Sequence, residues 1–426
     1  MNIPIRPAHC LKGTLPAPGD KSLSHRALMF SALAQGNATV RGLGPGADVK
    51  STAACLKALG VALEWNGTTC HIYGAGLHGL RVPKAPLDAG NSGTAMRLLL
   101  GILAGQSFDA TLMGDESLSR RPMGRVIQPL MQMGARIQAH EGTYAPLKIQ
   151  GTALKGFSYK MPVASAQVQS ALLLAGLYAQ GPTTVIEPGP IRDHTERMLS
   201  YLGADVKRKG QAVTVHPDNM LKAKDIEVLG DPSSAAFWLG AAALVAGSTI
   251  TVKNVCVNST RTGFVDALQA MGADVRRENE RMMCNEPHAD LTVSASPLKA
   301  VEISGELIPR LIDELPLLAI LATQARGTTT VRDAQELRIK ETDRIQAVAT
   351  NLRRMGARVE EREGGWVIPG PQVLRGATLD SFGDHRIAMA FSIAALVAQG
   401  ATTIQDAQWA DISYPGFFGE LERLRA

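Results

Sequence analysis

Residues 19–40 read GDKSLSHRALMFSALAQGNATV, and this stretch holds the unit from which the chain is built. A polar cluster containing Asp20 and Lys21 comes first, and a segment that is apolar almost all round follows it. The stretch closes on β-branched residues that favour a strand. One Asp or Ser is enough to cap a helix. The cations Lys21 and Arg26 and the ring of His25 are therefore a polar surplus that capping does not explain.

Two sequence elements recur along the chain and divide it into repeats. The first is an octapeptide of the type LKALGVAL, whose glycine stands at positions 60, 134, 203, 272 and 356. The second is a Thr- and Val-rich stretch that occurs as GNATV, FDATL, GPTTV, GSTITV, GTTTV and GATTI, each copy after an apolar segment of helical length. The pattern predicts a unit of strand, apolar helix, strand and amphipathic helix, with the octapeptide glycine at the helix C-cap and further short strands after it.

Helices that are apolar on nearly every side must be enclosed by the rest of the fold. We therefore predict an α/β (α+β) fold of six βαβαββ units, three in each of two domains, with sheets around the helices as a two-domain inside-out α/β barrel. Domain junctions are expected at the Gly-Asp turns near Gly19 and Gly230. Residues 19–229 then form one domain, and residues 1–18 with 230–426 form the other, which the N-terminal strand completes. Two crossings of the chain predict a hinge over a central cleft.

Composition and charge limit the class of protein. The 426 residues are 45% hydrophobic and 19% charged, with a net charge of +5 and no polybasic run. This charge balance argues against a protein that binds nucleic acid and suits an enzyme with a small anionic substrate. The five cysteines lack CxxC spacing, which argues against disulfides and a zinc site and for a reducing cytosol. Apolar runs fall short of the ~20 residues of a membrane span, and no signal core is present, so we expect a cytoplasmic protein that contacts no membrane.

Polar residues precede all six apolar segments, where helix N-termini are expected. The stretches are GDKSLSHR, DAGNSGTAMR, VASAQVQS, GDPSSAAF, LIDELP and FGDHRIAM. Caps suffice to explain GDPSSAAF and the Ser of VASAQ. A cation at the positive end of a helix is unfavourable, however, so Lys21, Arg26, His385 and Arg386 indicate an anion that neutralises them. Helix starts combined with Lys and Arg suit phosphate and carboxylate groups.

Two loops add charged residues to these clusters. They offer Arg120, Arg121 and Arg125 in SLSRRPMGRV, and Lys340, Glu341, Asp343 and Arg344 in ELRIKETDRI. An alternative for the second loop is a solvated helix with i,i+4 ion pairs. Asp313 and Glu341 stand out as carboxylates beside basic or apolar runs, although Asp313 is also explained by a plain helix cap. Equivalent positions in a repeat predict one shared anion-binding site.

Eight motifs resemble the signatures of the EPSP synthase (3-phosphoshikimate 1-carboxyvinyltransferase) family. They are DKSLSHR, GNSGTAMR, RRPMGR, SAQVQSALLLAGL, RDHTERM, IDELP, LRIKETDR and GDHRIAMAF, in this order over nearly the whole chain. The resemblance implies a fold of two domains that close around the substrate. It also implies transfer of the enolpyruvyl group of phosphoenolpyruvate to the 5-hydroxyl of shikimate 3-phosphate, a step toward chorismate and the aromatic amino acids. No metal or organic cofactor is implied.

The resemblance also implies which residues bind and react. Shikimate 3-phosphate is expected on Lys21, Ser22, Arg26, Ser165, Ala166, Gln167, Arg192, Asp313 and Lys340. Phosphoenolpyruvate is expected on Lys21, Gly93, Arg121, Gln167, Arg344 and Arg386. The catalytic residues are expected to be Asp313 as base for the 5-hydroxyl, Glu341 as the acid that serves C3 of phosphoenolpyruvate, and Lys21 as their assistant.

Two positions depart from the family pattern. Ala166 stands where many relatives have a second Ser, and Ile412 stands where many have a Lys near the C-terminus. The sister enzyme that acts on UDP-N-acetylglucosamine stays an alternative, although Lys21 is followed by Ser22 and GDESLSRRP contains no Cys. The RNA 3′-phosphate cyclase group and a non-catalytic anion-binding repeat protein are further alternatives. We expect a monomer whose only partners are its two small-molecule substrates, and which glyphosate inhibits at Gly93.

Overall fold

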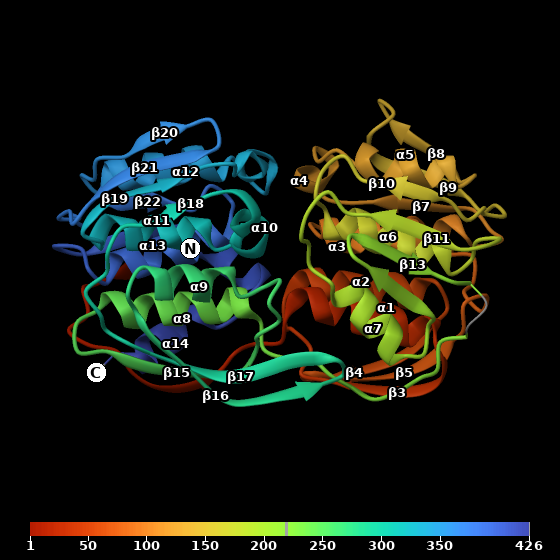
Figure 1. The fold of residues 1–426 in the computed structure, drawn as a ribbon, viewed down its shortest axis with the longest axis horizontal. Coiled ribbons are helices and arrows are strands. Elements are labelled where there is room, and N and C mark those ends of the chain that lie inside the picture. The colour runs from red at the N-terminus through yellow and green to blue at the C-terminus, as the bar shows by residue number, and fades with distance from the viewer. Residues whose placement is uncertain (218–219, 426) are drawn as a thin grey trace. The chain divides into compact units, whose positions relative to one another are not determined.

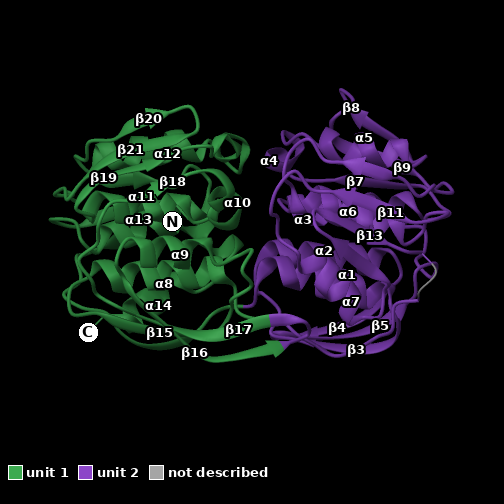
Figure 2. Ribbon diagram, in the orientation of Figure 1, with its two compact units in different colours: residues 1–18, 229–282, 287–426 green, residues 19–228, 283–286 purple. Residues whose placement is uncertain are grey.

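The computed structural model describes residues 1–217 and 220–425, which form a mixed α/β structure of six sheets and enclosed helices (Figure 1). Contacts divide the chain into two compact units (Figure 2). Unit 1 comprises Met1–Pro18, Leu229–Met282 and Pro287–Ala426, and unit 2 comprises Gly19–Val228 and Met283–Glu286. Across the described ranges, no helix combines the length and the apolar character that crossing a membrane requires.

Unit 2 contains three four-stranded sheets. In spatial order their strands are β14 (Ile226–Glu227), β3 (Gln35–Arg41), β5 (Thr69–Ala75) and β4 (Ala62–Asn66); β6 (Leu87–Asp88), β7 (Ala110–Met113), β9 (Tyr144–Gln150) and β8 (Arg136–His140); and β10 (Ser158–Lys160), β11 (Thr183–Ile186), β13 (Ala212–Val215) and β12 (Val206–Lys209). Its helices are α1 (Lys21–Leu33), α2 (Ala47–Ala58), α3 (Gly93–Ala104), α4 (Glu116–Ser119), α5 (Gly124–Gln132), α6 (Ala166–Gly176) and α7 (His194–Tyr201).

Unit 1 repeats this plan with two four-stranded sheets and one three-stranded sheet. Their strands are β16 (Asp274–Met283), β17 (Glu286–Ser294), β15 (Thr249–Cys256) and β2 (Lys12–Pro16); β18 (Glu302–Ile303), β19 (Gly327–Val331), β21 (Gly365–Gly370) and β20 (Glu360–Arg362); and β1 (Ile3–Ile5), β23 (Thr402–Gln405) and β22 (Thr378–Asp380). The helices are α8 (Pro232–Leu244), α9 (Gly263–Ala270), η1 (Gly305–Leu307), α10 (Ile308–Leu311), α11 (Leu315–Gln324), η2 (Gln335–Ile339), α12 (Arg344–Arg354), α13 (His385–Ala395), η3 (Ala407–Ile412) and α14 (Phe417–Leu424).

Near two of the places where the chain passes between the units, after Pro18 and after Val228, the repeats exchange one strand. β2 precedes α1 and β3 in the chain, yet it pairs in parallel with β15. β14 precedes α8 and β15, yet it pairs in parallel with β3. Every strand that carries the Thr- and Val-rich motif therefore keeps one parallel neighbour. Because β1 also pairs with β23, the N-terminal segment completes two sheets of unit 1.

The six apolar helices form the interior of the two units, as the pattern predicts. In unit 2, α3 packs against α6, and in unit 1, α11 packs against both α8 and α13. Gly101 permits the close approach of α3 to α6, because a Cβ at this position would lie 2.2 Å from the carbonyl oxygen of Ala171. Figure 1 shows sheets outside these helices. The predicted α/β fold is confirmed, although the six sheets share no strand among the described residues and so are separate open sheets rather than a closed barrel.

The recurring octapeptide is a Schellman motif at the end of an amphipathic helix. Its glycine follows α2, α5, α7, α9 and α12, and the five glycines have φ values between +81° and +100°. After α2, the Gly60 N–H donates to the Lys57 carbonyl at 2.9 Å, and the Val61 N–H donates to the Leu56 carbonyl at 3.0 Å. These bonds satisfy carbonyls that the helix leaves open, and only glycine adopts the left-handed conformation cheaply. The predicted C-terminal glycines are confirmed.

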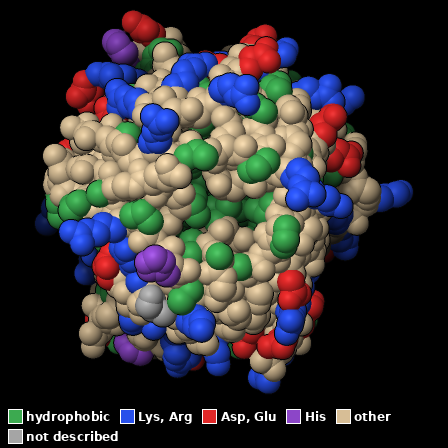
Figure 3. All heavy atoms as spheres, turned by 90° about the vertical axis from the view of Figure 1, so that its left-hand side faces the viewer, with side chains coloured by type: hydrophobic (Ala, Val, Ile, Leu, Met, Phe, Trp, Pro, Cys, Tyr) green, Lys and Arg blue, Asp and Glu red, His purple; other side chains and the backbone are tan. Residues whose placement is uncertain are grey.

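On the face of unit 1 drawn in Figure 3, acidic and basic side chains are interspersed, and hydrophobic side chains gather around a hollow near its middle. Mixed charge of this kind is typical of a solvated surface.

Candidate active site

In unit 2, the N-termini of α1, α3 and α6 are capped by Asp20, Ser92 and Ser165. The side-chain oxygen of each accepts a hydrogen bond from the backbone N–H three residues later, at 2.7, 3.1 and 3.4 Å respectively. These bonds satisfy donors of the first turn that have no partner inside the helix. The caps are acceptors, as expected, so the basic residues at the same helix starts serve another purpose.

Lys21, the first residue of α1, forms an ion pair with Asp48 of α2. The distance from Nζ to Oδ2 is 2.8 Å, and the Asp48 side chain is only 7% exposed. The carboxylate offsets a positive charge at the positive end of the helix dipole. Sequence analysis missed Asp48 because it lies 27 residues from Lys21, on a helix without a distinctive motif.

Arg26 is 3% exposed and ties α1 to two other helices of unit 2. Its Nε donates to Thr195 Oγ1 of α7 at 2.7 Å, and its Nη2 donates to Ser170 Oγ of α6 at 2.8 Å. Its Nη1 donates to the Ser22 carbonyl at 3.0 Å. The guanidinium therefore fixes the three helices relative to one another and lies beneath the more exposed Lys21 and Ser22.

Gln167 joins the start of α6 to the start of α3. Its Nε2 donates to Thr94 Oγ1 at 2.9 Å, and its Oε1 accepts a hydrogen bond from Arg97 Nη1 at 2.7 Å. Arg97 was not among the predicted site residues, although an arginine inside an apolar helix is a sequence signal that could have found it. The arrangement brings the predicted residues Gln167 and Gly93 together with an additional cation.

Gly93 and Arg121 lie at the same helix start. Arg121 Nη2 donates to Asn91 Oδ1 at 2.9 Å, just before the cap of α3. A Cβ on Gly93 would lie 2.7 Å from Arg97 Nη1 and 3.7 Å from Arg121 Nη1. Gly93 is the first residue of α3 and is not among the glycines with positive φ, so an unusual turn conformation does not explain it. Arg120, by contrast, pairs with Glu116 on an exposed part of the surface.

His25 is a buried, neutral link between three helices of unit 2. Its Nδ1 is 2.6 Å from Thr52 Oγ1 of α2, and its Nε2 is 3.4 Å from Ser92 Oγ at the start of α3. Burial is the largest cause that lowers the pKa of His25 to about 3, and the charges of Lys21 and Arg26 lower it further. The imidazole therefore accepts one hydrogen bond and donates another near neutral pH.

In unit 1, the first residue of α12 is Arg344, and its side chain is 1% exposed. Its Nε donates to Asp384 Oδ2 at 2.8 Å, and its Nη2 donates to Glu341 Oε2 at 2.6 Å. Burial would lower the pKa of the guanidinium, but the charges of Asp384, Glu341 and Asp313 raise it above its ordinary value. Residues 340–343 precede α12, so the alternative of an i,i+4 ion-pair helix for this loop is wrong.

Asp313 lies among three cations of unit 1. Its Oδ1 is 3.5 Å from Lys340 Nζ and 3.4 Å from Arg344 Nη1, and its Oδ2 is 3.9 Å from Arg386 Nη2. The N-cap residue of α11 is Glu314, so Asp313 is not the helix cap. The structure thus brings Asp313, Lys340, Glu341, Arg344 and Arg386 together around one cluster of opposite charges.

The start of α8 joins the same cluster through Glu314. Asp231 caps α8 by accepting a hydrogen bond from the Ser233 N–H at 2.9 Å. The Ser233 hydroxyl donates to Glu314 Oε1, and Arg386 Nη1 lies 3.7 Å from that oxygen. The prediction that caps alone explain GDPSSAAF is therefore wrong, because Ser233 also binds a residue of another helix start. In each unit, three helix starts are connected by side-chain contacts.

The remaining predicted positions lie at element boundaries. Ala166 is the first residue of α6, Arg192 lies two residues before α7, and Ile412 is the last residue of η3. Arg192 and Ile412 are both half-buried. Three residues outside the predicted set contact predicted residues, namely Arg97, Asp48 and Glu314. Ser233, also not predicted, contacts Glu314.

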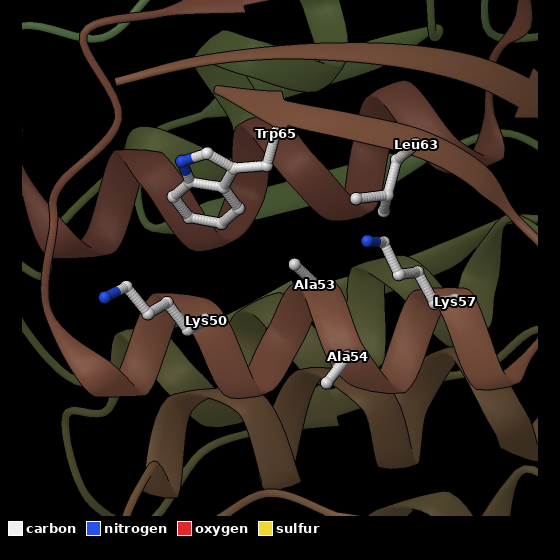
Figure 4. Close-up of a pocket in the computed structure, with 6 residues that line it drawn as sticks. All are labelled: Lys50, Ala53, Ala54, Lys57, Leu63 and Trp65. Atoms are coloured by element: carbon white, nitrogen blue, oxygen red, sulfur yellow. The ribbon is translucent and has the colours of Figure 1, made fainter. Parts of the chain in front are cut away.

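A hollow of about 280 Å³ lies between α2 and β4 in unit 2 (Figure 4). Ala53, Leu63 and Trp65 line it, and Lys50 and Lys57 lie at its sides. Its wall contains none of the predicted site residues and is almost wholly apolar. Because no predicted site residue lines it, this hollow is distinct from the candidate site.

One group in the described part of the chain has ligand atoms close enough for a metal, namely Asp193, His194 and Glu286. His194 Nδ1 lies 2.7 Å from Glu286 Oε1, and Asp193 Oδ2 accepts a hydrogen bond from Arg197 Nε at 2.6 Å. A guanidinium thus already bonds to one of the two carboxylates. We interpret the group as a buried hydrogen-bond network at the start of α7.

Comparison with known proteins places these features in a family. The sequence profile described as EPSP synthase (3-phosphoshikimate 1-carboxyvinyltransferase) matches residues 5–421. A 3-phosphoshikimate 1-carboxyvinyltransferase of Geobacillus kaustophilus is 52% identical over 417 residues, which are 97% of this chain and 98% of the relative. One of Brevibacillus brevis is 49% identical over 421 residues, 99% of each chain. A solved EPSP synthase of Acinetobacter baumannii is 42% identical and superposes with a TM-score of 0.90 over 100% of this chain and 98% of that one.

Proposed function

Because the chain belongs to the EPSP synthase family over residues 5–421, it is an enzyme that transfers the enolpyruvyl group of phosphoenolpyruvate to shikimate 3-phosphate in the shikimate pathway, and we propose that the connected helix starts of its two units bind these substrates. Each substrate carries a phosphate and a carboxylate. Bringing four anionic groups together requires several cations. Helix N-termini that carry Lys and Arg provide them.

The proposed shikimate 3-phosphate site comprises Lys21, Ser22, Arg26, Ser165, Ala166, Gln167, Arg192, Asp313 and Lys340. The proposed phosphoenolpyruvate site comprises Lys21, Gly93, Arg121, Gln167, Arg344 and Arg386. The contacts of Lys21 with Asp48 and of Arg344 with Glu341 support a role of these cations in binding anions, since each is held by a carboxylate that an incoming anion can replace. Arg26, with its three protein contacts, acts by orienting Ser22 and the first turn of α1.

We assign the proton transfers to Asp313 and Glu341, with Lys21 assisting. The 5-oxygen of shikimate 3-phosphate bonds to C2 of phosphoenolpyruvate while its proton passes to Asp313 and C3 accepts a proton from Glu341. The tetrahedral intermediate then loses phosphate from C2, and the leaving phosphate takes the proton that Asp313 had accepted. A proton returns from C3 to Glu341 to form the new double bond, so both carboxyl groups are restored. The substrate carboxylate competes for Arg344 and Arg386, which removes positive charge from Asp313 and makes it a stronger base.

The connections between the two units support a proposal of domain closure. The chain passes between them near Pro18 and Val228, and the tip of the β16–β17 hairpin belongs to unit 2. Short connections of this kind suit a hinge, and substrate closes the domains by neutralising the cations of both. We further propose that the protein works as a monomer in the cytoplasm, where its five free cysteines stay reduced.

One observation carries the proposal: in each unit, polar and charged side chains join three helix starts, and Lys or Arg lies among them. The test is phosphate release, which should require shikimate 3-phosphate and phosphoenolpyruvate together. Exchange of shikimate 3-phosphate for UDP-N-acetylglucosamine should abolish it. Phosphate release with the nucleotide sugar, or from phosphoenolpyruvate alone, would contradict the assigned substrates.

A further inference from the structure

A buried chain of polar contacts runs from the start of α8 to the start of α13 in unit 1. Arg261, which is 4% exposed, donates from Nη2 to Asp231 Oδ1 at 3.1 Å and to Ser233 Oγ at 3.0 Å. The Ser233 hydroxyl in turn donates to Glu314 Oε1. Arg386 Nη1 lies 3.7 Å from the same oxygen. None of Arg261, Ser233 and Glu314 belongs to the proposed substrate contacts.

Glu314 is a carboxylate whose position needs an explanation. It is 4% exposed, and it is the N-cap residue of α11 without making a side-chain cap bond. A buried carboxylate is costly unless cations and donors compensate it. Ser233 and Arg386 supply that compensation, and Arg261 fixes the Ser233 hydroxyl. The Glu314 carboxylate therefore interacts with Ser233 and Arg386 instead of capping α11.

The Arg386 guanidinium lies near two carboxylates. Glu314 Oε1 lies 3.7 Å from its Nη1, which also donates to the Asp313 carbonyl at 3.3 Å, and Asp313 Oδ2 lies 3.9 Å from its Nη2. A buried guanidinium that loses one anion moves to the other, because an unpaired buried charge is unfavourable. Without the charge of Glu314, Arg386 would pair more tightly with Asp313. That pairing would occupy both the cation proposed for phosphoenolpyruvate and the proposed base.

We infer that Glu314, fixed by Ser233 and Arg261, is a positioning residue that holds Arg386 toward phosphoenolpyruvate and away from Asp313. The inference rests on the proposed role of Arg386 in binding phosphoenolpyruvate. The start of α8 carries no proposed substrate contact, and by this inference its role is to fix Glu314 through Ser233.

The test compares the KM of each substrate in Glu314→Gln, which keeps the shape of the side chain and an oxygen that accepts the Ser233 hydrogen bond. The KM for phosphoenolpyruvate should rise about tenfold, the scale of a lost hydrogen-bond partner of a charged group. The KM for shikimate 3-phosphate should change much less. Ser233→Ala, which leaves Asp231 as the cap, should raise the KM for phosphoenolpyruvate by a smaller factor. This variant tests the inference if Glu314→Gln does not fold.

A double-mutant cycle with Arg386→Lys separates this inference from the proposed function. Arg386→Lys alone should raise the KM for phosphoenolpyruvate, and adding Glu314→Gln should raise it little further, because interacting residues are not additive. If Arg386→Lys leaves that KM unchanged, the proposed role of Arg386 fails. If Arg386→Lys raises it and neither Glu314→Gln nor Ser233→Ala does, only the positioning role fails.

The matched control is Glu187→Gln in unit 2. Glu187 is also buried, and it accepts hydrogen bonds from Arg208 at 2.7 and 3.0 Å and from Gln169, neither of which is a proposed substrate contact. Its replacement should lower thermal stability without raising the KM for phosphoenolpyruvate selectively. A selective rise in this control, or a lower KM for phosphoenolpyruvate in Glu314→Gln, would overturn the inference, since the latter would mean that Glu314 repels the substrate.

Discussion

Asp313→Asn tests the central chemical assignment, because the amide has the shape of the carboxylate but cannot take a proton from the 5-hydroxyl. The structure removes the ambiguity that the sequence leaves. The N-cap of α11 is Glu314, and the Asp313 side chain instead faces Lys340, Arg344 and Arg386. A loss of activity in this variant therefore cannot be attributed to a lost helix cap.

The expected loss is large in turnover and small in binding. Loss of a general base costs about 10²- to 10⁴-fold in kcat, which corresponds to about 3 to 5 kcal/mol in the activation free energy. Arg344 keeps Asp384 and Glu341 as partners, and Arg386 keeps Glu314, so the cluster of cations should stay folded. Substrate affinities should stay within roughly tenfold of the original, since loss of one carboxylate also relieves repulsion of the anionic substrates.

The assay is phosphate release at saturating concentrations of both substrates, with substrate binding measured separately by calorimetry. Asp343→Asn is the matched control in the neighbouring loop. Asp343 caps α12 by accepting a hydrogen bond from the Gln346 N–H at 3.0 Å, and Asn caps equally well. Turnover should survive in this control. Unchanged turnover in Asp313→Asn would remove Asp313 from the mechanism.

Three further predictions follow from the same contacts. Gly93→Ala should fold, because its φ is not left-handed and the atom nearest to the added methyl is Nη1, at the end of the long Arg97 side chain, at 2.7 Å. It should weaken inhibition by glyphosate, which is longer than phosphoenolpyruvate, far more than it raises the KM for phosphoenolpyruvate. Equal losses for both ligands would contradict this. His25→Asn should reduce the loss of stability at low pH. Burial lowers the pKa of His25 from 6.5 to about 3, so on acidification the unfolded chain binds the proton first. In the original protein the free energy of unfolding therefore falls as the pH drops below 6.5, by about 2 kcal/mol down to about pH 4.5. Urea unfolding at both pH values measures this, and an unchanged difference between them would refute it. Shikimate 3-phosphate should reduce the radius of gyration in small-angle scattering, and an unchanged radius would count against the hinge.

The repeating architecture could be predicted from the sequence alone, because the signals for it are local. Apolar helices between β-branched strands predict enclosed helices, and α1, α3, α6, α8, α11 and α13 lie where the pattern places them. The octapeptide glycines follow the five amphipathic helices with positive φ, since a Schellman motif depends on a few neighbouring residues. The surplus of cations at helix starts likewise needed no tertiary information to be noticed.

The contacts of each charged residue at these helix starts could not be predicted without the three-dimensional structure. Asp48 reaches Lys21 from another helix, and Ser233 reaches Glu314 across 81 residues. Arg26 belongs to the same motif as the predicted substrate contacts Lys21 and Ser22. Its guanidinium is nevertheless buried, with hydrogen bonds to Thr195 and Ser170. Spacing along a chain limits contacts within one helix or hairpin, but ion pairs between helices depend on how those helices pack. The contact partners and the burial of a charged side chain determine whether it binds substrate or positions another residue. Both are therefore properties of the packed fold.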